Sequence, residues 1–343
     1  MADAVHFPSP IMSTIKLALG AVRYWARGHT PDSAYQSMIS LFCQSGGVSN
    51  DRLSRVVSRL HPPYALDAAQ GVLGEFRDED LDRITHDLEE RGYHVFERRL
   101  PADLCDRLLA FALSNRCTAR AMSGQQRTEA KEVKRYPREQ PGSVRYDFSA
   151  QDVIDNADVQ ALMADRSLIA LAQSYLRSKP IFDVMSMWWH TAYSKQPDHD
   201  AAQFYHFDMD RIKWLKFFIY LTDVGPDNGP HCFISGSHRS GGIPRALLAK
   251  GYTRLSDEEV AACYPGERFI EFIAPRGTVI AEDTRGLHKG KHVLSGDRLM
   301  LQVQFSNSLY GGIYARTRFA RVASPVLSDM LRRYPRLYSN YMD

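Results

Sequence analysis

The segment at 204–223, FYHFDMDRIKWLKFFIYLTD, decides the predicted fold, because its second half has the composition of a buried β-strand. Aromatic and β-branched residues pack well on a pleated, largely buried surface. Similar short runs, separated by turn sequences such as GPDNGP, PRG and LSGD, follow one another beyond residue 180. They are IFDVMSMWWHTAYS (181–194), AAQFYHFD (201–208), WLKFFIYLTDV (214–224), HCFISGS (231–237), RFIEFIA (268–274), GTVIAED (277–283) and RLMLQVQFSN (298–307). Short strands joined by tight turns predict a β-sandwich or a β-barrel.

The rest of the chain predicts helices on both sides of this β region. Residues 1–72 contain three runs with helix start and stop signals, and we assign them to a helical N-terminal extension. Residues 73–320 form the predicted main domain, which is mainly β with flanking helices, and residues 321–343 form a C-terminal helical tail. Within the main domain, the polar stretch 123–141 predicts a long exposed loop.

The first predicted helix, at 13–27, is amphipathic, with Ile15, Leu19, Val22 and Trp25 on one face and basic residues beside them. Such a helix either packs its apolar face on the main domain or lies on a membrane surface. We favour packing on the main domain, because a surface helix of a globular protein usually turns its apolar stripe to the core. The N-terminal helices are also the predicted contact of a homodimer.

Composition restricts the partners. The chain has 43 Lys and Arg against 40 Asp and Glu, interspersed, and lacks the single-sign block that is typical of nucleic-acid-binding segments. Its five cysteines are unevenly spaced and form neither a zinc-binding CxxC pair nor a disulfide framework. A secretory signal and an apolar run of the roughly 20 residues that span a bilayer are both missing from the sequence. We therefore expect a cytoplasmic protein that binds no nucleic acid and has no transmembrane segment.

Two metal-binding side chains, His206 and Asp208, stand directly before the buried run of the opening segment. Residues two apart on a strand point to the same face, so both side chains can reach one metal ion. A third ligand is available downstream in His288, and ten residues later Arg298 opens another strand. Two His and one carboxylate suit non-haem Fe(II), and an Arg beside them can bind a carboxylate through two hydrogen bonds.

The order of these motifs resembles the phytanoyl-CoA dioxygenase-like family of Fe(II)/2-oxoglutarate-dependent oxygenases. The resemblance covers roughly residues 75–312 and includes the opening LEERGYHVFERRLP. Its motifs, in order, are His206-Phe-Asp208, NGPHCFISGSH (228–238), Gly277, Asp283, LHKG with His288, and Arg298. Each motif is weak alone, but the common order and compatible spacing make the resemblance specific.

This resemblance implies a double-stranded β-helix, a jelly-roll of the cupin-like kind in which two four-stranded antiparallel sheets pack together, with helices on one side. It implies that His206, Asp208 and His288 bind Fe(II) and that Arg298 pairs with the distal carboxylate of the cosubstrate 2-oxoglutarate. With O2, such an enzyme hydroxylates or otherwise oxidises an unactivated C–H bond of a small-molecule metabolite and releases succinate and CO2. Halogenases of this type have a small residue at the position of Asp208, so the carboxylate favours hydroxylation.

Several side chains near the motifs have two interpretations. His292, four residues after His288, is an alternative third ligand, but the His-x-Gly setting and the spacing to Arg298 favour His288. Asp210 either supports the ligands from behind or belongs to a turn. Gln203 and Trp189 either line the 2-oxoglutarate pocket or pack in the core.

The substrate side is less defined by the sequence. Trp214 starts the strand after the ligands, and Arg145 and Tyr146 follow the charged loop, where they either grip an anionic or sugar-like substrate or belong to a solvated face. Two other functions also remain: a non-catalytic β-sandwich binding module derived from the oxygenase fold, and a cupin-like metal enzyme of other chemistry. The sequence identifies no substrate.

Overall fold

The structure, a computed structural model, describes residues 7–66, 69–120 and 133–342. Its helices are α1 (Pro10–Arg27), α2 (Asp32–Ser45), α3 (Val48–Leu60), α4 (Asp78–Arg91), α5 (Ala102–Ser114), α6 (Ala150–Ile154), α7 (Ala157–Met163), α8 (Arg166–Leu176), α9 (Arg245–Leu248), α10 (Asp257–Ala261), α11 (Pro325–Arg333) and the 3-10 helix η1 (Gly266–Arg268). Its strands are β1 (Gln70–Gly71), β2 (Gly74–Glu75), β3 (Tyr93–Val95), β4 (Arg116–Ala119), β5 (Val133–Arg135), β6 (Arg145–Asp147), β7 (Ile181–Thr191), β8 (Trp214–Tyr220), β9 (His231–Ile234), β10 (Phe269–Phe272), β11 (Val279–Glu282), β12 (His288–Gly290) and β13 (Asp297–Ser306).

Two antiparallel sheets form the jelly-roll. The large sheet has eight strands in the order β3-β11-β8-β13-β7-β6-β4-β5, and the small sheet has three in the order β10-β9-β12. The predicted mainly β fold with a double-stranded β-helix core is confirmed, although the resemblance implied two sheets of four strands. The division is unequal because β3 extends one edge of the large sheet and β4, β5 and β6 extend the other. The segment with His206 is joined to the small sheet by an isolated bridge to His288 and forms no regular strand of that sheet.

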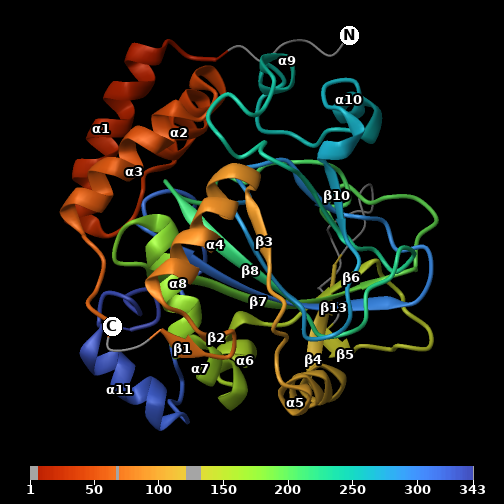
Figure 1. Ribbon diagram of the computed structural model, residues 1–343. Coiled ribbons are helices and arrows are strands. Elements are labelled where there is room, and N and C mark those ends of the chain that lie inside the picture. The colour runs from red at the N-terminus through yellow and green to blue at the C-terminus, as the bar shows by residue number, and fades with distance from the viewer. Residues whose placement is uncertain (1–6, 67–68, 121–132, 343) are drawn as a thin grey trace.

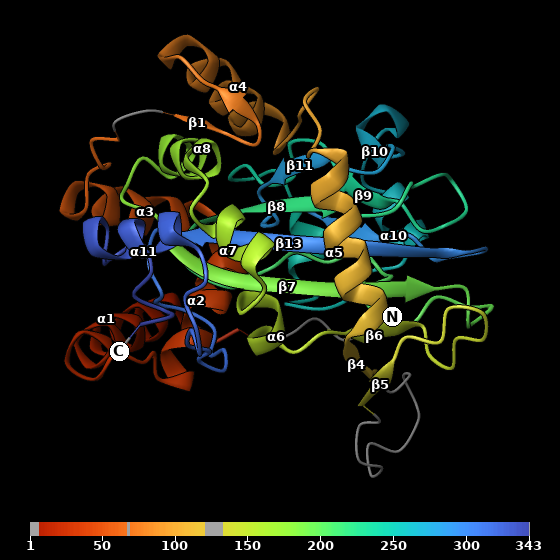
Figure 2. The ribbon, with the colours of Figure 1, turned by 90° about the horizontal axis from the view of Figure 1, so that it is seen from below.

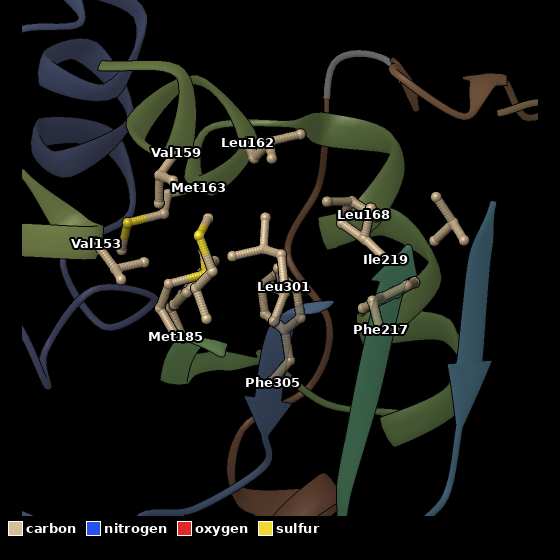
Figure 3. Close-up of a cluster of buried hydrophobic side chains, with 14 of the residues drawn as sticks. Val153, Val159, Leu162, Met163, Leu168, Met185, Phe217, Ile219, Leu301 and Phe305 are labelled. Atoms are coloured by element: carbon tan, nitrogen blue, oxygen red, sulfur yellow. The ribbon is translucent and has the colours of Figure 1, made fainter. Parts of the chain in front are cut away.

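Alternation along the central strands separates the core from the opposite face of the large sheet. On β7, β8 and β13, the side chains of Met185, Phe217 and Leu301 point toward α6, α7 and α8, where they meet apolar residues of the helices (Figure 3). Their strand neighbours Ser186, Lys216 and Gln302 point the other way. The central strands therefore present an apolar face to the helices and a partly polar face to the interior of the jelly-roll.

Helices cover the apolar face. Figure 2 shows α5 crossing in front of β7, β13 and β8, with α6 and α7 beside it. Local capping defines several boundaries: the Asp165 carboxylate accepts hydrogen bonds from two N–H groups at the start of α8, and Ser256 and Glu259 form a capping box on α10. Gly28 ends α1 in the left-handed conformation, at a φ of 72°, which glycine adopts without strain.

The N-terminal helices pack on the β domain through α2 and α3. The Phe42 ring of α2 stacks on Phe207 with ring centroids 5.3 Å apart, and Asp51 of α3 forms an ion pair of 2.9 Å with Arg285. Helix α1 lies outside them, at the edge of the molecule (Figure 1). The prediction that α1 buries its apolar face is wrong, because its buried residues are Ser13, Leu17 and Gly20. The boundaries at 72 and 320 and the homodimer stay predictions.

The remaining predicted segments are partly described. Residues 123–132 of the predicted loop lie outside the described residues, whereas Val133–Arg135 form β5, which pairs with β4, and Tyr136 is buried. The tail contains α11, and its residues Leu327, Leu337 and Tyr338 belong to the core below the large sheet. Among the described residues, none of the helices is long and apolar enough to cross a bilayer.

Candidate functional site

His206, Asp208 and His288 meet inside the jelly-roll and can hold a metal ion. One donor atom from each residue lies within 4.8 Å of the others. The Asp208 Oδ1 atom is 3.8 Å from His206 Nε2, and Asp208 Oδ2 is 3.4 Å from His288 Nε2. His206 and His288 face each other because their backbones form an antiparallel bridge, with N–H to carbonyl distances of 3.0 and 2.8 Å. The same-face argument from the spacing of His206 and Asp208 therefore agrees with the geometry.

Backbone carbonyls orient both imidazoles. His206 Nδ1–H donates to the Phe204 carbonyl at 2.9 Å, and His288 Nδ1–H donates to the Gly286 carbonyl at 3.0 Å. In each neutral ring the proton is thus on Nδ1, so Nε2, the nitrogen nearer the Asp208 carboxylate, can offer its lone pair to a metal ion. Metal-binding histidines usually donate their other ring nitrogen in this way. The donor set therefore fits a divalent transition metal.

Burial and neighbouring charges shift the pKa values of the three groups in different ways. Burial, with the neighbouring His288 and Arg254, holds the pKa of His206 well below its ordinary value, so this imidazole is neutral near pH 7. Burial raises the pKa of Asp208, but Lys216 and the two histidines outweigh it and leave that pKa well below its usual range. Burial also lowers the pKa of His288, and the Asp208 carboxylate outweighs this effect and raises it.

A buried ammonium group, Lys216 on β8, lies behind the carboxylate ligand. Its Nζ atom donates to Asp208 Oδ2 at 2.6 Å and to Asp210 Oδ2 at 3.1 Å. The hydroxyl of Tyr314 donates to the other oxygen of Asp210. Asp210 thus faces the same side as Asp208 and supports the lysine that contacts the candidate ligand.

Replacing Lys216 with Met should destabilise the metal-free protein by about 3–5 kcal/mol, because two buried carboxylates lose their cation. Fe(II) should stabilise this variant against unfolding by more than it stabilises the unchanged protein, since in the variant the dication is the cation that neutralises both carboxylates. Thermal unfolding with and without Fe(II) measures both effects. Lys213→Met is the control, because the Lys213 side chain is partly buried on the same chain segment but donates to the Tyr175 carbonyl. Equal responses to iron in the two variants would contradict the role of Lys216.

Arg298 is a buried cation with incomplete hydrogen bonding. Its side chain is 1% exposed, and it donates to the Gly229 carbonyl and, at 2.7 Å, to His190 Nδ1. Its Nε atom has no partner, and the residues that the structure describes place no carboxylate in an ion pair with it. A buried guanidinium is costly unless an anion pairs with it. The site therefore fits a ligand with a carboxylate group.

The candidate ligands and Arg298 line one cavity of about 230 Å³. Apolar side chains from the central strands, Val184, Trp188, Phe218 and Met300, form part of its wall. A larger surface hollow of about 790 Å³, beside α5, contains none of the metal-binding groups. Among the described residues, the smaller cavity is thus the one that combines a metal-binding cluster with an unpaired buried cation.

The predictions for neighbouring residues have mixed outcomes. Arg145 lines the cavity, with its guanidinium 4.6 Å from the centre of the Trp188 ring. Trp189 and Tyr146 do not line it, because they point to the helix-covered face of the large sheet, where both contact Tyr136. The expected position of Trp189 on the cavity wall is instead taken by Trp188, one residue earlier.

Three other predicted residues also lie outside the cavity wall. The Trp214 side chain is buried at the start of β8, and its indole N–H donates to Thr284 Oγ1 at 2.8 Å. The Gln203 side-chain carbonyl accepts a hydrogen bond from the Asp198 N–H at 2.7 Å, so this side chain closes a turn. His292 is 3.4 Å from Gln203 and is not part of the metal-binding cluster.

Sequence reasoning missed two histidines of the cavity. His190 is buried, and its Nδ1 accepts from Arg298 and from the Trp188 indole while its Nε2–H donates to the Ala201 carbonyl. His231 contacts both oxygens of Glu282 at 3.0 Å, and burial raises the pKa of Glu282 to about 8. No sequence signal was available for His190, because β7 is buried on both faces and its residues do not indicate whether Trp188 and His190 or Trp189 face the cavity.

A jelly-roll that holds two His and one Asp inside is characteristic of the Fe(II)- and 2-oxoglutarate-dependent oxygenases. Residues 88–300, more than half of the chain, match the phytanoyl-CoA dioxygenase (PhyH) family, so the chain belongs to this family. Its members use Fe(II), 2-oxoglutarate and O2, which confirms the predicted cofactors. No curated protein matches the chain in sequence.

Several solved structures have a similar fold. The non-haem α-ketoglutarate-dependent epimerase SnoN from nogalamycin biosynthesis is 18% identical, over 74% of this chain and 90% of that one, with a TM-score of 0.48. EctD from S. alaskensis, with bound Fe, is 17% identical over 72% and 80%, with a TM-score of 0.46. HygX from Streptomyces hygroscopicus, with nickel and 2-oxoglutarate bound, is 14% identical over 74% and 94%, with a TM-score of 0.45. At these values they bear on neither the substrate nor the reaction of this chain.

Proposed function

We propose that this protein hydroxylates an unactivated C–H bond of a small-molecule metabolite, with consumption of O2 and 2-oxoglutarate and release of succinate and CO2. His206, Asp208 and His288 hold the Fe(II), and Arg298 binds the distal carboxylate of 2-oxoglutarate. The observation that carries the proposal is that three metal donors line the same cavity as a buried cation to which the described part of the chain offers no carboxylate partner.

Bound iron, with 2-oxoglutarate and O2, supplies the oxidant for the C–H bond. The chain supplies orientation and exclusion of water. Arg298 can offer a planar pair of N–H donors to a carboxylate, and His190 holds the guanidinium from one side at 2.7 Å. Phe218 and Met300 exclude water from the wall of the cavity. Arg145 is the proposed contact for a polar or anionic group of the substrate.

Asp208 supports hydroxylation in particular. It leaves no small residue at the carboxylate position, which a halogenase of this type would need for a halide. The alternative of a binding module without catalysis has less support, because a site that had lost its function would have no reason to keep three donors and a buried Arg298. A cupin-like enzyme with another metal leaves Arg298 without a role.

Reaction under ¹⁸O2 tests the proposal. Anaerobically reconstituted Fe(II) protein should convert 2-oxoglutarate to succinate slowly alone and faster with a substrate found by metabolite screening, and the hydroxylated product should carry one ¹⁸O atom. Two results would overturn the proposal: no turnover of 2-oxoglutarate with Fe(II), or substrate-dependent turnover without oxygen in the product. Conversion of a metabolite by the Zn(II) or Mn(II) protein without uptake of O2 would favour a cupin-like metal enzyme of other chemistry.

A further inference from the structure

Helix α1 exposes an apolar stripe along its full length. The stripe consists of Ile11, Met12, Ile15, Leu19, Val22 and Trp25. Trp25 is 88% exposed, Ile11 74% and Val22 65%, which is unusual for large apolar side chains on one face of a single helix. Figure 1 shows α1 at the edge of the molecule, beyond α2. None of the residues that the structure describes covers this stripe.

The opposite face of α1 fixes this orientation. Ser13, Leu17 and Gly20 are buried against α2, and a Cβ atom on Gly20 would lie 2.2 Å from the Ala34 Cβ. The Tyr310 hydroxyl also donates to the Leu17 carbonyl at 2.9 Å. The helix therefore contacts the protein through the face that carries Ser13, Leu17 and Gly20, and rotation of the apolar stripe toward α2 would place a large side chain at the position where only glycine fits.

Charge selects the partner of the stripe. Lys16, Arg23 and Arg27 are exposed on α1, and the helix has no acidic residue. Helices α1 to α3, at 10–60, contain six Lys and Arg against two Asp, a larger excess than the net +3 of the whole chain. Two copies of α1 facing each other would bring like charges together, whereas anionic lipid headgroups would neutralise them.

We propose that α1 docks the protein on the surface of an anionic phospholipid bilayer. The helix lies parallel to the surface, with the apolar stripe at the boundary between headgroups and acyl chains and the basic residues among the headgroups. This position suits Trp25, whose ring combines an apolar body with a polar N–H group. The inference concerns a surface of the extension and does not depend on the reaction of the cavity.

Vesicle binding tests the proposal with the full chain. The protein should co-sediment with vesicles of phosphatidylcholine and phosphatidylserine at least about tenfold better than with phosphatidylcholine alone, and added salt should reduce the difference. Trp25 also gives an internal signal, because Trp188, Trp189 and Trp214 are buried. Its fluorescence should shift to shorter wavelength on the anionic vesicles.

Substitutions distinguish binding through the stripe from nonspecific adsorption to the vesicles. Val22→Gln and Trp25→Gln should each reduce vesicle binding about tenfold, since each removes apolar area from the membrane contact. Val56→Gln, at a position of α3 that is 52% exposed, is the matched control and should bind as the unchanged protein does. Unchanged Fe(II) binding and melting temperature verify folding in all three.

Two outcomes would overturn the proposal. One is equal or absent binding to both kinds of vesicle. The other is a stable dimer in solution that Val22→Gln converts to a monomer, because a second copy then covers the stripe. Neither result depends on turnover of 2-oxoglutarate, so failure of the docking proposal and failure of the proposed reaction are distinguishable.

Discussion

Replacing His288 with Ala should abolish stoichiometric Fe(II) binding and reduce 2-oxoglutarate turnover by more than about 100-fold. Loss of a hydrogen-bond partner of a metal ligand already costs roughly 10–100-fold in metal affinity or activity, and loss of a ligand itself costs more. His288 provides one of the three donors, with its Nε2 atom 3.4 Å from Asp208 Oδ2. Metal analysis after anaerobic reconstitution and succinate production measure the two effects.

His292→Ala is the matched control for this experiment. His292 is four residues from His288, is partly buried and contacts Gln203 at 3.4 Å, outside the metal-binding cluster. Its removal should leave iron binding and turnover within about twofold of the unchanged protein. Loss of iron in His292→Ala, with iron retained in His288→Ala, would show that the ligand assignment is wrong.

Replacing Arg298 with Ala should raise the KM for 2-oxoglutarate by about 100-fold or more while one Fe(II) per chain remains bound. Truncating one partner of a buried, hydrogen-bonded charge pair costs roughly 2–5 kcal/mol, which corresponds to a factor of about 30 to several thousand. Arg298→Lys should recover a part of the affinity, because Lys keeps the charge but lacks the planar fork of Arg. Cosubstrate titration at saturating Fe(II) gives the KM, and metal analysis gives the iron content.

Arg138→Ala is the control for the arginine. The Arg138 guanidinium binds Asp297, the residue next to Arg298, but lies 5.5 Å from the centre of the Trp189 ring on the outer face of the sheet. Its removal should therefore leave the KM for 2-oxoglutarate unchanged. An unchanged KM in Arg298→Ala would remove Arg298 from the cosubstrate site, and loss of iron in that variant would instead indicate a structural role.

The metal cluster could be predicted because it depends on alternation and order alone. His206 and Asp208 share a face whether the segment is a regular strand or, as observed, an extended segment with isolated bridges. Whether Trp188 or Trp189 lines the cavity could not be predicted in the same way. Strand β7 is buried on both faces, so its apolar residues do not indicate which face points to the helices.

Other features depended on tertiary contacts. The position of Lys216 could have been inferred, since a lysine two residues before Phe218 on a buried strand shares its face. The partners of Lys216 could not be inferred, because they come from another segment. The exposure of the α1 stripe could not be predicted. An amphipathic pattern shows that a helix has an apolar face and does not show what covers that face, and here the close contact of Gly20 with Ala34 decided its direction.

The packing of Phe42 on Phe207 has a consequence for where the enzyme begins. Phe207 and Met209 alternate with the candidate ligands and lie in the same apolar cluster as Met38 and Phe42 of α2. Asp51 reaches Arg285, which precedes His288 by three residues. A polypeptide limited to the homologous region 88–300 would keep every motif residue and lose the support behind both halves of the metal cluster. The region that matches the family and the packing around the metal cluster thus have different boundaries in this chain.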